Sequence, residues 1–190
     1  MATRNILKDG EKGLLKKSRT VTDFNKRLHI LLDDMRETLI EANGVGLAAP
    51  QVGVLRRVAL IVDMCIESEQ LNDDCEEDVE DENQNRNTID INELIIELIN
   101  PEIVTEEGEQ TGNEGCLSIP GVYGIVTRPE TVVVRAQDRN GKTFEIEVSE
   151  MTARAACHEV DHLNGVLFTT LAERILTEEE LAELAQQKEE

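Results

Sequence analysis

Residues 158–162 have the sequence HEVDH, in which two histidines stand four positions apart and a glutamate follows the first. On a helix, residues four apart lie on one face, so His158 and His162 can offer ring nitrogens to one metal ion while Glu159 lies beside its water molecule. A surface helix with two unrelated histidines is the alternative. The chain contains only three histidines, however, and two of them fall at ligand spacing. The pattern therefore favours a metal-dependent hydrolase.

Two histidines leave a catalytic metal one protein ligand short, because hydrolytic sites commonly use three and keep one position open for water. Zinc peptidases take the third ligand from a downstream Glu or His, but residues 163–171 contain neither. Glu173 is the nearest downstream carboxylate and is rather close in sequence for that role. Cys116, in the segment EGCLSIP at 114–120, is the better candidate, as a thiolate on a strand that could lie against the helix. A buried structural thiol is the alternative for Cys116.

Residues 44–51 have the sequence GVGLAAPQ, a run of small side chains closed by a proline and an amide. Small side chains let a backbone approach a ligand closely, and Pro50 fixes the chain so that Gln51 points in a set direction. The alternative is a glycine loop that only ends the preceding helix. A phosphate-binding loop is excluded, because the lysine and hydroxyl residue that such loops need are missing.

The composition limits the class of protein. A formal net charge of −21 and a pI near 4.4 argue against nucleic acid or anionic membrane as partners, since both require a basic surface. A hydrophobic content of 39% with 2% aromatic residues predicts one domain with an aliphatic core. The four cysteines follow no disulfide framework, the start of the chain does not resemble a signal peptide, and no apolar run could span a bilayer. We therefore expect a cytoplasmic protein.

The elements of the first half can be predicted from hydrophobic spacing and from turn residues. They are an extended arm at residues 1–20, an amphipathic helix from a cap at Thr22 to about Ala42, a buried strand at 57–63, and an apolar strand at 94–99 that ends at Asn100-Pro101.

Between these last two strands, residues 67–93 are crowded with Asp, Glu, Asn and Gln. Such a segment cannot bury enough apolar surface to offset the entropy of ordering it. We therefore expect one catalytic domain, residues 1–190, interrupted by a mobile acidic insertion at about 67–93.

The second half is predicted to contain strands and the helix that carries the HEVDH (HExxH) segment. The expected elements are a flexible stretch at 106–113, strands at 131–137 and 143–148 joined by a hairpin turn at 138–141, the helix between a Ser149 cap and an Asn164-Gly165 stop, a short strand at 166–168, and an acidic terminal helix opened by a capping box at 177–180.

Taken together, the segments GVGLAAPQ at 44–51, EGCLS at 114–118 and HEVDH at 158–162 resemble the three motifs of the peptide deformylase family, in the same order. The resemblance implies that Cys116, His158 and His162 bind one Fe(II) per chain, with Zn(II) or Ni(II) as replacements. It also implies an α+β fold with antiparallel β-sheets packed around a central HExxH helix, an N-terminal helix and a C-terminal helix. A zinc metallopeptidase that uses the same helix with a different third ligand is the remaining alternative.

The resemblance also implies roles for further residues. Glu159 would act as general base, while the Gln51 amide and the Leu117 backbone N–H would stabilise the oxyanion. Gly46 could offer its carbonyl to the substrate amide, and the methionine side chain needs an apolar pocket. The candidates for that pocket are Val45, Met151 and Ala155.

The implied substrates are N-formyl-methionyl nascent peptides near the ribosome, processed by a monomer with no nucleic-acid or membrane contact of its own. The chain departs from many family members at Cys157, where a Gln is frequent, and at Tyr123, where some members have an Arg that contacts the peptide. The acidic tail at 178–190 argues against an RNA contact through a basic terminal helix.

Overall fold

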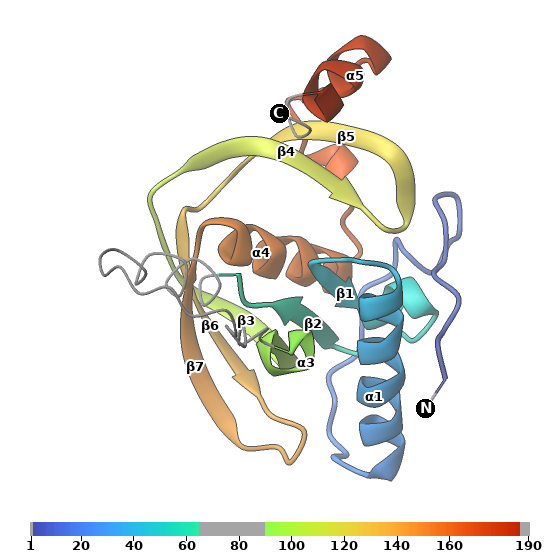
Figure 1. Ribbon diagram of the computed structural model, residues 1–190. Coiled ribbons are helices and arrows are strands. Elements are labelled where there is room, and N and C mark those ends of the chain that lie inside the picture. Colours follow the sequence, from blue (N-terminus) through green and yellow to red (C-terminus); the bar gives the residue numbers. More distant parts are fainter. Residues whose placement is uncertain (1, 65–89, 187–190) are drawn as a thin grey trace, which may run out of the picture.

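The computed structural model describes residues 2–64 and 90–186, which form antiparallel sheets and helices (Figure 1). One sheet has the strand order β1-β2-β3-β6-β7 and the other has the order β4-β5-β8. The first contains β1 (Gly46–Ala48), β2 (Val58–Val62), β3 (Ile95–Glu107), β6 (Thr131–Gln137) and β7 (Thr143–Ser149). The second contains β4 (Gln110–Cys116), β5 (Ile119–Arg128) and β8 (Arg174–Ile175). The mixed α+β fold with antiparallel sheets agrees with the sequence prediction.

The helical elements connect and flank these strands. They are α1 (Lys26–Glu41), the short 3-10 helix η1 (Ala49–Val52), α3 (Ile91–Leu94), α4 (Glu150–Asn164), the 3-10 helix η2 (Phe168–Thr170) and α5 (Glu178–Gln186). No helix among residues 2–64 and 90–186 is long and apolar enough to cross a membrane.

Helix α4 carries the HEVDH segment and packs against β1 and β2 of the five-stranded sheet. It follows Ser149 and ends at Gly165, whose φ of 76° is the left-handed conformation predicted for its stop. Ala153, Ala156 and Cys157 lie in the apolar cluster between this helix and the sheet. In Figure 1, β4 and β5 pass over the other side of the helix.

The predicted start of the first helix was wrong. Helix α1 begins at Lys26 because the side chain of Asn25, rather than Thr22, accepts hydrogen bonds from the first free N–H groups, at Arg27 and Leu28. The helix is amphipathic as predicted, and its buried apolar residues are Leu28, Leu31, Leu32, Met35 and Leu39.

The predicted strand end at Asn100-Pro101 was also wrong, because β3 continues through this dipeptide to Glu107. The register with β6 shifts between Ile99 and Glu102, and Asn100 has a φ of 53°. At such a bulge a proline is tolerated, since its missing N–H breaks no regular ladder bond. The Asn100 side chain instead bonds the backbone N–H and C=O of Val21, at 2.8 and 2.9 Å.

Two further predictions were wrong. Residues 106–113 are not irregular, because a turn at Gly108 (φ 67°) leads β3 of one sheet directly into β4 of the other. Residues 166–168 do not form a strand, because the chain turns into η2 and buries Phe168. The hairpin of β6 and β7 and the capping box between Thr177 and Glu180 are confirmed.

Residues 67–89, most of the predicted acidic insertion, lie outside the described part of the chain. Its last residues already belong to the folded body, because the Asp90 side chain accepts from the Asn92 N–H and caps α3. The arm at residues 2–20 has no helix and only one isolated bridge, from Arg19 to Arg56. It lies against the body through bonds such as Ser18 N–H to the Leu163 carbonyl, at 2.8 Å.

Candidate metal centre

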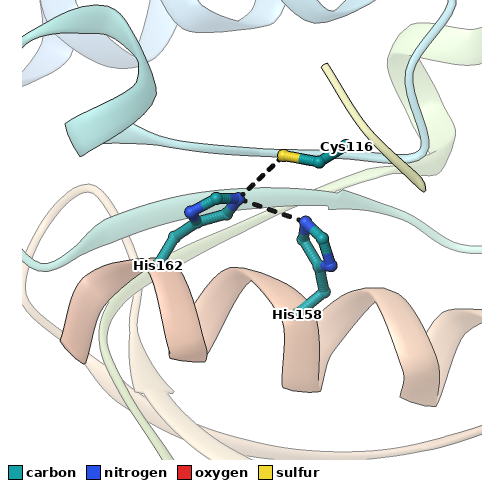
Figure 2. A group of neighbouring side chains, drawn as sticks. All are labelled: Cys116, His158 and His162. Carbon is teal, nitrogen blue, oxygen red and sulfur yellow. Dashed lines mark hydrogen bonds between the residues drawn. The ribbon is translucent and has the colours of Figure 1, made fainter. Parts of the chain in front are cut away.

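The three predicted metal ligands converge at one point. Cys116 is the last residue of β4, and His158 and His162 lie on adjacent turns of α4. His162 Nε2 is 3.1 Å from Cys116 Sγ and 3.1 Å from His158 Nε2 (Figure 2). Within the described residues, these three are the group of His, Cys, Asp and Glu side chains whose ligand atoms, all within 4.8 Å of one another, could hold a metal ion.

The geometry fits a tetrahedral ion. Bonds of about 2.1 Å to nitrogen and about 2.3 Å to sulfur place such ligand atoms about 3.3 to 3.6 Å apart. The two separations that involve His162, at 3.1 Å each, need only a slight opening, and all three ligand atoms lie within 4.8 Å of one another. One sulfur and two ring nitrogens form a three-ligand set, which leaves one tetrahedral position for water or substrate.

Glu114, in the second motif, orients His158 and was not assigned a role from the sequence. Its Oε1 lies 2.6 Å from His158 Nδ1, so that Nε2 of the same ring faces the other two ligands. Arg128 donates two bonds to the Glu114 carboxylate, at 2.8 and 3.1 Å, and Arg154 donates one at 3.2 Å. Arg128 also donates to Asp161, at 2.6 Å. A buried carboxylate clamped by two buried arginines thus links β4, β5 and the HExxH helix.

The electrostatics of this network distinguish the two histidines. Burial would raise the pKa of Glu114, but bonds from His158 and Arg128 lower it to about 2, so Glu114 is ionised. Burial and the neighbouring His158 lower the pKa of His162 to about 3, so this ring is neutral and has a free lone pair. Burial would also lower the pKa of His158, but Cys116 and Glu114 raise it to about 10. Ligands must be deprotonated to hold a metal ion, so metal binding to this group would release a proton.

Glu159 lies beside the metal group without belonging to it. Its side chain is buried, and Oε2 has no hydrogen-bond partner among the described residues. Burial raises the pKa of Glu159 to about 7, a value suited to both taking and returning a proton near neutral pH. The backbone of Gly46 is in direct contact with this carboxylate, because a Cβ at Gly46 would collide with the Glu159 carboxyl group. The glycine of the first motif therefore makes room for the glutamate of the third.

Gln51, in η1, is held with its amide toward the thiol. Its Oε1 accepts from the Ala48 N–H at 2.7 Å, which leaves Nε2 3.5 Å from Cys116 Sγ and 3.4 Å from Ser118 Oγ. Leu117 follows Cys116 directly in the turn between β4 and β5. The amide of Gln51 and the residue Leu117 thus both lie next to Cys116.

A cleft of about 640 Å³ opens onto this centre. All four residues predicted to contact substrate line it, and Val45 and Met151 at its rim are half exposed. These lining residues are Val45, Gly46, Met151 and Ala155.

Glu173, the alternative third ligand, lies elsewhere, where it accepts from Thr127 Oγ1 at 2.7 Å on the surface. Cys157, where many family members have a Gln, is buried in the apolar cluster on the sheet side of α4 and does not belong to the metal group.

A three-ligand centre at the base of a cleft, with a buried carboxylate beside it, defines a metal-dependent hydrolase. Residues 3–177 match the family described as polypeptide deformylase. Peptide deformylase of Thermoanaerobacter pseudethanolicus is 48% identical over 95% of this chain and 96% of its own length. Peptide deformylase 1 of Bacillus subtilis is 45% identical over 97% and 99%. The crystal structure of a peptide deformylase from Legionella pneumophila superposes with a TM-score of 0.72 at 37% identity, covering 97% of this chain and 92% of the other.

The chain belongs to the polypeptide deformylase family and is an enzyme that removes N-formyl groups in a metal-dependent reaction. The alternative of a metallopeptidase with a different third ligand is not favoured.

Proposed function

We propose that Cys116, His158 and His162 hold one Fe(II) ion per chain and that the enzyme deformylates the N-terminal formyl-methionine of nascent peptides. The observation that carries this proposal is the convergence of one thiol and two ring nitrogens next to a buried, unpaired carboxylate oxygen of Glu159. Thiolate and imidazole ligands suit Fe(II), and Zn(II) or Ni(II) can replace it in such a site. We also propose that α4 is the central element of the fold, since both sheets contact it.

The reaction adds water to the formyl carbon and breaks the C–N bond, which releases formate and a free amine. When bound, a divalent ion acidifies a water molecule and polarises a carbonyl group. Glu159 accepts a proton as water attacks and then transfers it to the departing amine nitrogen. The pKa of about 7 for Glu159 supports both transfers, because neither protonation state is strongly disfavoured.

Negative charge develops on the formyl oxygen during this attack. The Gln51 side-chain amide and the Leu117 N–H are proposed as its donors. The placement of Gln51 Nε2, 3.5 Å from Cys116 Sγ, supports this assignment because the amide is held before substrate arrives. A preorganised donor of this kind lowers the barrier by about 3 kcal/mol.

The substrate is proposed to lie in the cleft, with its methionine side chain against Val45, Met151 and Ala155 and its amide on the Gly46 carbonyl. A Met-Ala-Ser peptide is bound in the crystal structure of a peptide deformylase from Acinetobacter baumannii that is 31% identical to this chain. The walls of the cleft here combine apolar side chains with the polar centre, which suits a methionine that carries a formyl group.

We propose a single-domain monomer that acts in the cytoplasm on nascent chains near the ribosome. The net charge of −21 supports a transient encounter through the peptide rather than direct binding to RNA or to an anionic membrane. Size-exclusion chromatography with light scattering measures the oligomeric state, and a stable dimer would contradict this part of the proposal.

The function is tested by anaerobic loading of metal-free protein with Fe(II) or Zn(II), followed by assays on formyl-Met-Ala-Ser and, as a control, acetyl-Met-Ala-Ser. We expect release of formate from the first peptide only, with the iron form faster. On exposure to air the iron form should lose activity, with oxidation at Cys116, because both the metal and its sulfur ligand are redox-active. The zinc form should be stable. Equal air stability with an unmodified Cys116 in both forms would argue against the thiolate ligand.

A further inference from the structure

The N-terminal arm lies across the two segments that carry the proposed oxyanion donors. The Leu7 N–H donates to the Gln51 carbonyl at 2.7 Å, and the Asp9 N–H donates to the Ser118 carbonyl at 2.9 Å. Between them, Lys8 Nζ donates to the Leu117 carbonyl at 2.9 Å. Residues 7–9 of the arm therefore bond both segments. They bond Gln51, whose amide is one proposed donor, and the 117–118 turn, whose Leu117 N–H is the other.

These two segments also contact each other directly, through hydrogen bonds of Gln51 and through Leu117, which packs against the apolar cluster that contains Ala49 and Val52 of η1. Gln51 belongs to η1, next to the five-stranded sheet, whereas the 117–118 turn joins β4 and β5 of the three-stranded sheet. Gln51 Nε2 donates across this gap to Cys116 Sγ and Ser118 Oγ, at 3.5 and 3.4 Å. The bonds from the arm, at 2.7 to 2.9 Å, are shorter and form a further connection between the two segments.

The arm is itself anchored on both sides. Ile6 packs against the apolar cluster under α1 and β2, and Leu7 packs against the cluster that contains Ile119, Val126 and Phe168. Adjacent residues of the arm are therefore inserted into two different parts of the core. The arm therefore connects the cores next to the two sheets, close to the segments that carry the proposed donors.

We propose that residues 6–9 position the two oxyanion donors relative to each other and that Lys8 is a positioning residue for Leu117. The inference rests on the proposed function of Gln51 and Leu117. An oxyanion donor acts only if it stands at the right distance before the charge develops, so a shift of a few tenths of an ångström is felt in turnover. The Lys8 ammonium forms a charge-assisted bond, which holds the turn more firmly than a neutral donor would.

The proposal is tested with Lys8→Met, which removes the ammonium and keeps most of the stem, and with Lys8→Arg, which keeps a charged donor. Lys12→Met is the matched control, because Lys12 is an exposed lysine of the same arm that does not line the cleft and its loss changes the net charge equally. All variants are prepared as full-length, metal-loaded protein, and their metal content and Tm are measured. Kinetics on formyl-Met-Ala-Ser are combined with hydrogen exchange of the peptide that covers residues 114–120.

We expect Lys8→Met to lower kcat by about five- to tenfold with KM within about twofold, because the donor is displaced while the other residues that line the cleft are unchanged. Exchange at residues 114–120 should become faster in this variant. Lys8→Arg and Lys12→Met should retain wild-type kcat, exchange and metal content.

A kcat of Lys8→Met equal to that of Lys12→Met would overturn the proposal, as would a change confined to KM, which would make Lys8 a direct substrate contact. Equal losses in both Lys8 variants, together with a lower Tm, would show structural damage and also count against it. The proposed function fails separately, if wild-type enzyme does not release formate or if Gln51→Ala has wild-type kcat.

Discussion

Helix α4 presents an apolar face to the five-stranded sheet and a polar face to β4 and β5. On the first face Ala153, Ala156 and Cys157 make only packing contacts of the kind that small apolar side chains allow. On the second face Arg154 and His158 are equally buried, but each is tied to the Glu114 carboxylate of β4. Burial alone therefore does not mark a functional residue on this helix. What distinguishes Arg154 and His158 is that they are bonded to Glu114 of β4, next to the candidate metal centre.

The largest expected effect is on the polar face, from His158→Ala. Loss of one of three ligands should abolish metal binding, and the rate should fall by more than about 10⁴-fold because no group replaces the ion. Metal content by mass spectrometry and formate release measure the two effects. Full metal content in this variant would remove His158 from the ligand set.

Glu159→Gln should separate metal binding from catalysis on the same face. The amide is nearly isosteric but cannot accept the proton, so kcat should fall by about 10³-fold while metal content stays at the wild-type level. The two quantities are measured on the same preparation as for His158→Ala. Turnover within tenfold of wild type would contradict the role of general base.

Arg128→Met should weaken the centre without touching a ligand. It leaves Glu114 and Asp161 without their shared partner, and removing one member of a buried ion pair costs about 3 to 5 kcal/mol of stability. Because Glu114 orients His158, metal affinity should also fall, by about 10- to 100-fold. Chemical denaturation and competition with a chelator measure these losses. Unchanged metal affinity in a destabilised variant would confine Arg128 to a structural role.

Cys157→Ala tests the apolar face and should have a much smaller effect. The change removes one buried sulfur from a packed cluster, for which we expect a loss of about 1 kcal/mol and a Tm lowered by about 2 to 4 °C. Activity and metal content should be unchanged. A tenfold loss of kcat in this variant would mean that the two faces of α4 are not independent.

The smallest effect is expected on removal of residues 68–88 and their replacement by a short Gly/Ser link. Asp90 is kept because it caps α3. The acidic segment is too polar to contribute to the core, and changing the length of a loop costs only about 0.6 kcal/mol per doubling. Steady-state kinetics should agree with wild type within about threefold, and a loss above tenfold would place the segment at the site.

The candidate residues of the site and their chemistry could be predicted from local patterns in the sequence. The spacing of His158 and His162, the small residues before Gln51 and the cysteine of the second motif are local patterns that each require a particular side chain at a particular position. The same holds for the Gly165 stop, for β2 and for the β6–β7 hairpin, whose signals lie within a few adjacent residues. Local patterns of this kind can be read because helix and strand periods place their residues on known faces.

The groups that support these residues from distant parts of the chain could be identified only in the tertiary structure. Glu114 meets His158 across 44 positions, and Lys8 meets Leu117 across 109. The bulge at Asn100 is tied to Val21 in the same way, across 79 positions, and it carries β3 through a proline that local rules read as an end. Such contacts depend on strand register and on how the two sheets close over α4. No periodic pattern encodes them, because each depends on the packing of all the elements that lie between its partners in the chain.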